Sequence, residues 1–117
     1  MDIATFTDYC LTKRGAEASL PFDEKTWVCK VGGRIFVLAI IEPFESFSVK
    51  CEPLLAQRLR DQYECIKPGY HMNKRHWNTI HLTGELDKAQ LLEMIDASYE
   101  LVFSKLSDKE KKGWGLG

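Results

Sequence analysis

Two glycines between two runs of strand-forming residues constrain the fold of this chain more than any other feature. Gly32 and Gly33 separate residues 26–31 from residues 34–41, and both runs are rich in β-branched and aromatic side chains. A glycine pair tolerates positive φ at both positions, which is the backbone that a two-residue hairpin turn requires. The sequence therefore predicts a β-hairpin here, with its two strands antiparallel.

The other segments extend this hairpin to an α+β pattern. Helical spacing of apolar residues predicts helices over residues 3–14, 53–63 and 88–106, and a short helix after Ser107. Further strands are predicted over residues 46–50 and 77–82, whereas residues 64–76 lack both periodicities and are predicted to be a loop. The order α-β-β-β-α-β-α-α predicts an antiparallel sheet with helices packed on one face.

Local patterns mark several helix ends. The first helix is expected to run as far as Arg14, which places cations in its last turn, where the helix dipole favours them. Asp87 with Gln90, and Ser107 with Glu110, have the capping-box spacing, so each pair is expected to begin a helix.

Length and charge limit the organisation of the chain. With 117 residues, of which 44% are apolar, residues 1–117 are expected to form a single domain with a real core. The 16 basic and 17 acidic side chains give a net charge of −1, which excludes a protein that is basic all over. Any contact with a polyanion must therefore come from a local patch.

The cysteines and the apolar runs indicate where in the cell the protein is expected to be. No pair among the four cysteines has the close spacing of a zinc ribbon or a redox motif. The first residues lack the basic and apolar regions of a signal peptide, and the longest apolar run has seven residues, against about 20 for a membrane span. We expect a cytoplasmic protein with reduced thiols and no contact with a membrane.

One segment stands out in composition, because residues 66–84 contain no Asp or Glu. The segment instead contains Lys and Arg side chains, which neutralise phosphates. It also contains amide and imidazole groups, which form hydrogen bonds with nucleic acid, and an aromatic ring that can stack on a base. A solvated loop whose Trp side chain enters the core is the structural alternative. The candidate nucleic-acid-binding residues in this segment are Lys67, His71, Asn73, Lys74, Arg75, His76 and Trp77.

Metal binding and catalysis are not expected. The three histidines follow the spacing H-x4-H-x4-H, and in a strand residues five apart point to opposite faces, so His76 and His81 would not share an ion. No nucleophile elbow, phosphate-binding glycine loop or metal motif is present. We expect a protein that is not an enzyme and that needs no cofactor, although a Cys/His or Ser/His pair could still meet in space.

The segment from Lys67 to Ile80, with the sequence KPGYHMNKRHWNTI, resembles the signature of the MmcQ/YjbR-like family. The first helix, the Gly32-Gly33 hairpin and the stretch Leu86–Tyr99 support the resemblance, which covers nearly the whole chain. It implies a fold similar to the frataxin-like (CyaY-like) class, described as a double-wing DNA-binding architecture, in a small bacterial cytoplasmic protein.

The resemblance also carries roles over to individual positions. The signature residues here are His71, Asn73, Lys74, His76 and Trp77, whereas Arg75 is included for its charge alone. Frataxins bind iron along an acidic ridge on the first helix. The first helix here offers few acids and ends in basic residues, so iron binding is not carried over.

The leading hypothesis is a module that binds nucleic acid, and the resemblance implies that this nucleic acid is DNA. Lys74 and Arg75, helped by Lys67, would contact phosphates, and three to five such contacts predict a log–log salt slope of roughly −3 to −4. Two alternatives stay open: an adaptor that binds an acidic protein partner or serves an oligomer, and a small-molecule or catalytic pocket around the three histidines.

Overall fold

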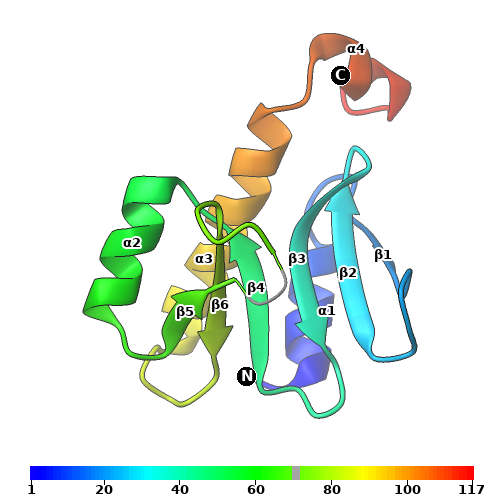
Figure 1. Ribbon diagram of the computed structural model, residues 1–117. Helices are drawn as coiled ribbons and strands as arrows, with labels where there is room; N and C mark the ends of the chain where they lie inside the picture. The colour runs from blue at the N-terminus through cyan, green and yellow to red at the C-terminus, as the bar shows by residue number, and fades with distance from the viewer. Residues whose placement is uncertain (70–71) are drawn as a thin grey trace.

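The computed structural model describes residues 1–69 and 72–117, and Figure 1 shows their arrangement. Helices and strands follow one another along these residues in a mixed order. Their bounds are α1 (Ile3–Leu11), β1 (Glu17–Ser19), β2 (Thr26–Val31), β3 (Arg34–Ile40), β4 (Ser46–Lys50), α2 (Pro53–Gln62), β5 (Ile66–Pro68), β6 (Trp77–His81), α3 (Lys88–Ser104) and α4 (Asp108–Gly113).

The strands form one antiparallel sheet with the order β1-β2-β3-β4-β6-β5. The α+β class and the order of the longer elements are thereby confirmed. Gly32 and Gly33 join β2 to β3 with φ values of 57° and 78°, as the predicted hairpin turn requires. The two edge strands, β1 and β5, have three residues each and were not predicted, because so short a strand shows no alternation. β5 occupies part of the predicted loop over 64–76.

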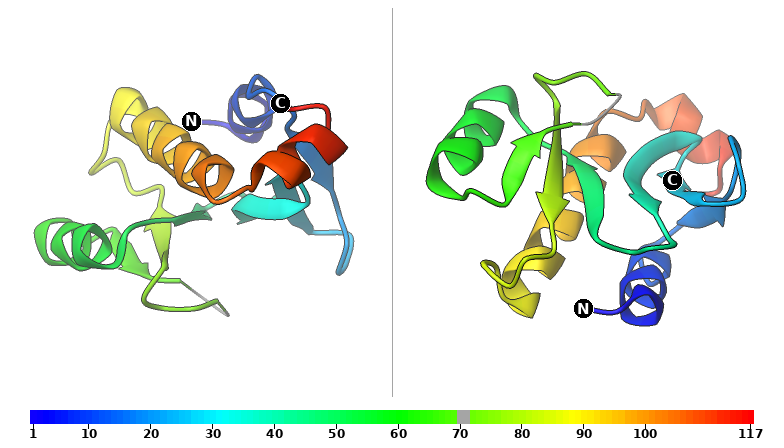
Figure 2. Two further views of the ribbon diagram at one scale, coloured as in Figure 1. Left: turned by 90° about the horizontal axis from the view of Figure 1, so that it is seen from above. Right: turned by 60° about the horizontal axis from the view of Figure 1, so that its bottom comes forward.

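One face of the sheet is covered by α1 and α3, as the left view of Figure 2 shows. The ring of Phe6 on α1 lies at the centre of an aromatic cluster. Its centroid is 5.6 Å from that of Trp27, 4.8 Å from Phe44 and 5.1 Å from Phe47. Phe6 and Cys10 are both 0% exposed, so the burial of these two side chains, of which Phe6 is the larger, holds this helix on the sheet.

A buried serine links α3 to the middle of the sheet. The hydroxyl of Ser98 donates to the carbonyl of Phe36 at 2.6 Å and accepts from the N–H of Lys50 at 2.8 Å. Phe36 lies where β3 shifts register against β2, so its carbonyl is not used in that ladder. Ser98 therefore satisfies polar groups of β3 and β4 where the strand pairing is interrupted.

The predicted first residues of the helices are confirmed, but the predicted end of α1 is wrong. Asp87 and Ser107 both form complete capping boxes. α1 ends at Leu11 instead of Arg14. Lys13 lies beyond the helix and forms an ion pair with Asp96 of α3, which also accepts a hydrogen bond of 2.6 Å from the hydroxyl of Tyr9. The ion pair between Lys13 and Asp96 of α3 thus replaces the expected interaction of Lys13 with the dipole of α1.

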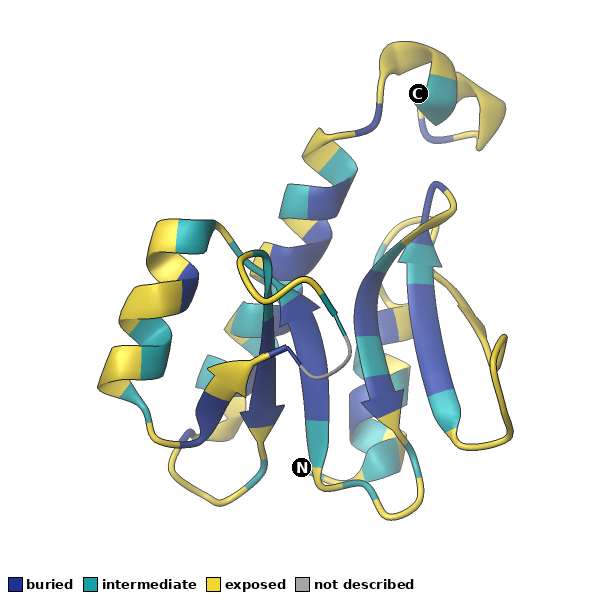
Figure 3. Cartoon of the chain, in the orientation of Figure 1, coloured by how far each residue is buried: buried dark blue, intermediate teal, exposed yellow. Residues whose placement is uncertain are grey.

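The second face of the sheet carries no helix within the described chain (Figures 1 and 2). We call it the open face. Alternate residues of the strands point to it, among them Leu38, Ser48 and Thr79, which are neighbours in register across β3, β4 and β6. Figure 3 shows that these central strands are nonetheless largely buried.

α2 lies at the edge of the sheet beside β5 and β6, and much of its surface is exposed (Figure 3). Pro53 is its first residue, where a missing N–H costs nothing. None of the helices within residues 1–69 and 72–117 has the combination of length and apolar content that a membrane span requires.

The Phe6 cluster gives a direct test of the core. We expect Phe6→Ala to lower the free energy of unfolding by about 3–5 kcal/mol, because it removes a fully buried ring and leaves a cavity. The control is Leu54→Ala on α2, where the side chain is 79% exposed and the expected loss is below about 0.5 kcal/mol. Urea unfolding followed by circular dichroism measures both, and equal losses would show that Phe6 does not anchor α1.

Candidate nucleic-acid interface

Residues 72–76 form a tight turn that leads into β6. The backbone carbonyl of Asn73 accepts hydrogen bonds from the N–H groups of His76 at 3.2 Å and Trp77 at 3.0 Å. The side-chain oxygen of Asn73 accepts from the N–H of Arg75 at 2.9 Å, as in an Asx turn. Because both oxygens of Asn73 are engaged inside the turn, this residue shapes the loop that presents Lys74 and Arg75 to solvent.

Arg60 of α2 fixes this turn to the helix. Its Nη2 donates to the carbonyl of Lys74 at 2.6 Å, and its Nε donates to the side-chain oxygen of Asn78 at 2.8 Å. Asn78 is only 2% exposed and also donates to the carbonyl of Ala56 at 3.4 Å. The guanidinium therefore joins α2, the turn and β6 through hydrogen bonds that one planar group with several donors can make together.

The fold thereby gathers three cations, Arg60, Lys74 and Arg75, which we call the cationic cluster. Lys74 and Arg75 are exposed, and Arg60 is half-buried. Neither of the ion pairs found in the described part of the chain involves these side chains. The cluster thus keeps its positive charge available to an external anion.

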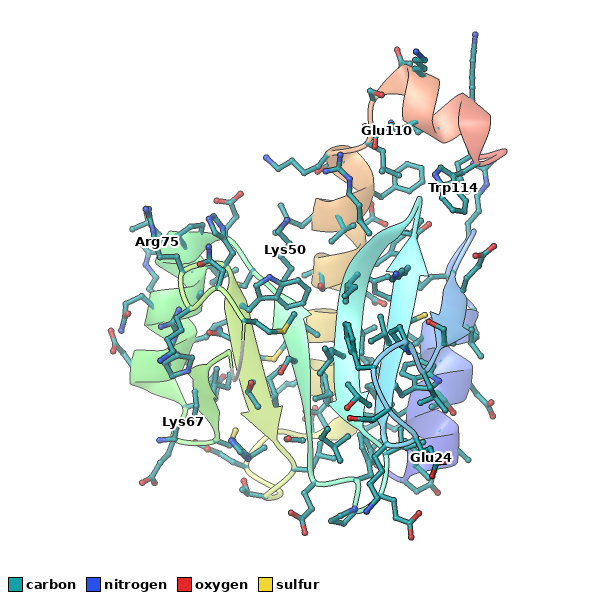
Figure 4. All side chains as sticks on the ribbon, turned by 45° about the vertical axis from the view of Figure 1, so that its right-hand side comes forward. Glu24, Lys50, Lys67, Arg75, Glu110 and Trp114 are labelled. Carbon is teal, nitrogen blue, oxygen red and sulfur yellow. The ribbon has the colours of Figure 1, made fainter. Side chains whose placement is uncertain are left out.

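Lys67 does not join this cluster. It lies on β5 and shares a surface depression with Glu64 and Glu85. Figure 4 shows Lys67 and Arg75 at opposite ends of the same side of the molecule. The carboxylate of Glu85 accepts the N–H of Cys65 at 2.8 Å, and this hydrogen bond is the main reason why the pKa of Glu85 is lowered. An ionised Glu85 beside Lys67 reduces the positive potential at that end.

The remaining predicted site residues divide between loop and strand. His76 is half-buried, and its carbonyl accepts the N–H of Cys51 at 2.7 Å. His71 lies outside the described residues. His76 precedes β6 and His81 ends it, so these two imidazoles do not converge on one cleft. Among residues 1–69 and 72–117, no three His, Cys, Asp or Glu side chains are grouped as metal ligands.

Trp77 anchors the turn to the open face. It pairs with Lys50 in the register of β6 and β4, so both side chains lie on the same side of the sheet. The N–H of Gly69 donates to the carbonyl of Trp77 at 2.8 Å, and a Cβ added at Gly69 would lie 2.6 Å from the Cβ of Trp77. Glycine is thus required where the chain passes Trp77. The half-buried indole leaves part of its ring for another contact.

The cysteines offer no activated nucleophile. All four are free thiols, and Cys10, Cys29 and Cys65 are buried. Burial raises the pKa of Cys29 to about 12 and that of Cys65 to about 11. Cys51 is half-buried, and burial raises its pKa as well, with Glu52 adding to the effect. Thiols with raised pKa values are poor nucleophiles at neutral pH.

Sequence reasoning missed Arg60 and Lys50 as members of this surface. Each is separated from residues 72–77 by at least ten positions in the chain, and nothing local distinguishes Arg60 from Arg58 on the same helix. Helical spacing gives the only usable signal, since Arg60 lies four residues after Ala56, the buried residue of α2.

Comparison with known proteins identifies relatives along nearly the whole chain. A model of the YjbR family matches residues 11–101. The chain is 35% identical to the Escherichia coli K12 protein YjbR over 113 residues, which cover 96% of both chains. It is 33% identical to the Escherichia coli O157:H7 protein YbdF, over 86% of this chain and 89% of that protein. Both relatives are described as uncharacterized proteins.

Solved structures also resemble this chain in fold. The crystal structure of the Deinococcus radiodurans protein DR2400, with the family-model domain DUF419, superposes with a TM-score of 0.89. It is 33% identical, and the match covers 99% of this chain and 89% of that one. A crystal structure from Pseudomonas syringae, 24% identical, gives a TM-score of 0.74 over 87% of this chain and 99% of that one, and shares the fold.

The Arg60 bridge gives a testable prediction. We expect Arg60→Leu to lower the free energy of unfolding by about 1–3 kcal/mol, because the buried oxygen of Asn78 loses its charged donor. Amide hydrogen exchange at His76 and Trp77 should accelerate, since the turn is no longer tied to α2. Urea unfolding and exchange measured by NMR provide both values.

The matched control is Arg58→Leu, which removes the same charge from an exposed position on the same helix. It should leave both stability and exchange near wild type. If the two variants behave alike, the bridge does not hold the turn.

Proposed function

Because this chain belongs to the YjbR family, and the relatives named above are described as uncharacterized proteins, we infer its function from its own surface. We propose that it is a non-enzymatic protein that binds nucleic acid, in the first instance duplex DNA, through the cationic cluster. The observation that supports this most is the convergence of Arg60, Lys74 and Arg75 without an ion-paired carboxylate in the described chain.

The chemistry of the cluster suits phosphates. Arg and Lys side chains supply the charge that displaces counterions from a phosphate backbone, and this sequence-independent contribution dominates weak binding. The two exposed cations lie on a turn whose shape is fixed by Asn73 and Arg60, so little ordering is required when an anion binds. The half-buried indole of Trp77, with Lys50 beside it, lies at the base of the same turn and could stack on an unpaired base.

The proposed contact set differs from the one that the sequence suggested. Lys67 contributes little, because Glu64 and Glu85 share its surface depression. Arg60 takes its place. Asn73 acts by shaping the turn. A cytoplasmic location is part of the proposal, in keeping with the free thiols of this chain.

The salt dependence of binding tests the proposal. We expect a fluorescently labelled duplex of about 20 base pairs to bind with a dissociation constant in the range of about 1–100 μM. Three phosphate contacts predict a log–log slope of about −2.7, so binding should weaken by about 40-fold between about 50 and about 200 mM salt. Fluorescence anisotropy measures both, and binding that does not change with salt would exclude a phosphate interface.

Charge reversal locates the interface. Lys74→Glu combined with Arg75→Glu should weaken DNA binding by at least about tenfold, because two phosphate contacts become repulsive. The matched control is Lys109→Glu with Lys112→Glu, which changes the net charge equally at exposed positions on α4. Equal losses in the two double variants would show that net charge, and not the cationic cluster, governs binding.

A further inference from the structure

The open face of the sheet contains a concave pocket that the cationic cluster does not use. Its volume is about 380 Å³, and its floor is formed by residues of β3, β4 and β6. One wall is Phe22, from the segment between β1 and β2, and another is Met72, from the turn before β6. The two described histidines, His76 and His81, do not line it.

The floor of the pocket combines an apolar surface with desolvated hydroxyl groups. Ser48 and Thr79 lie side by side in register, with their hydroxyl oxygens 2.8 Å apart, and are only 4% and 5% exposed. Leu38 is the register neighbour of Ser48 on the other side. A serine hydroxyl has one donor and two acceptor sites, and the bond to Thr79 uses one of the three. Ser48 therefore keeps hydrogen-bonding capacity at the bottom of the pocket.

The mouth of the pocket is apolar. Phe22 is 68% exposed and Ile40 is 43% exposed, although both line the pocket. Among the described residues that line it, none carries a charge. A charged ligand would lose its hydration here without gaining a counter-ion, so the pocket favours an uncharged ligand.

The pocket also restricts the size and kind of occupant. A cavity of about 150 Å³ holds one benzene molecule, so this pocket has room for about two rings. Its floor strands are interior strands of the sheet, with their backbone groups already paired, so an extended peptide cannot add to them as a further strand.

We propose that this pocket binds an uncharged small molecule with an apolar body of about two rings and a polar group that hydrogen-bonds to Ser48. The geometry that supports this is the buried hydroxyl floor between β4 and β6, enclosed by Phe22 and Met72. The proposal does not depend on nucleic-acid binding, because Arg60, Lys74 and Arg75 do not line the pocket.

Two dyes with related ring systems test the proposal, in the absence of nucleic acid. Propionyl-dimethylaminonaphthalene has two fused rings, is uncharged and carries a carbonyl oxygen that can accept a hydrogen bond, whereas dimethylaminonaphthalene sulfonate has the same two rings with a negative charge. We expect the uncharged dye to bind the wild-type protein saturably at one site, with a blue shift and an increase in fluorescence. The anionic dye should bind at least about tenfold more weakly. In NMR spectra, the uncharged dye should shift the amide signals of Leu38, Ser48 and Thr79.

A pair of variants locates the dye. Ile40→Glu places a carboxylate at the mouth of the pocket, and should weaken binding of the uncharged dye by at least about tenfold. Leu54→Glu makes the same kind of change at an exposed leucine of α2, outside the pocket, and should leave binding unchanged. If Ile40→Glu does not fold, Phe22→Ser in the connecting segment removes the wall instead and should weaken binding in the same way.

Three results would overturn the proposal. The first is that the uncharged dye does not bind saturably, and the second is that it binds the Ile40→Glu and Leu54→Glu proteins equally well. The third is a dimer in sedimentation equilibrium that dissociates in Ile40→Glu, since the open face would then be covered by a second copy of the chain.

Discussion

When helices cover only one face of a sheet, the apolar side chains on the other face must be buried by connecting segments and by one another. This constraint governs the present structure. α1 and α3 bury the first face through Phe6 and the buried side chains of α3. On the open face, the segment before β2 and the turn before β6 replace a helical layer, and they enclose a pocket of about 380 Å³ between them. Both candidate sites of the molecule follow from this arrangement.

The turn before β6 serves both candidate sites with different side chains. Met72 contributes to the wall of the pocket, whereas Lys74 and Arg75 are directed to solvent. Arg60 is important because it fixes the turn that lies between them, through the carbonyl of Lys74 and the buried amide of Asn78. A single change in the position of this turn would therefore alter the charged surface and the pocket together.

The relationship to the YjbR family settles the fold more firmly than the role. The match spans residues 11–101, and a related crystal structure superposes with a TM-score of 0.89 at 33% identity. Similarity of this kind fixes the sheet and its covering helices, but function depends on the groups that a particular chain places on its surface.

The sequence by itself determined those features whose physical cause is local. The Gly32-Gly33 turn depends on two residues that tolerate positive φ, and the capping boxes at Asp87 and Ser107 depend on side chains three residues apart. The absence of acids from residues 66–84 is likewise visible in the sequence.

Only the tertiary structure decided which charges lie together, because separation in space is not separation along the chain. It brought Arg60 to Lys74 from 14 positions away, and it placed Lys67 beside Glu64 and Glu85, the acids that border the acid-free segment. The edge strand β5 exists through its pairing with β6. The pocket exists because β3, β4 and β6 meet the segments that carry Phe22 and Met72 over one face. Such features depend on contacts between residues far apart in sequence, for which a single chain carries no local signal.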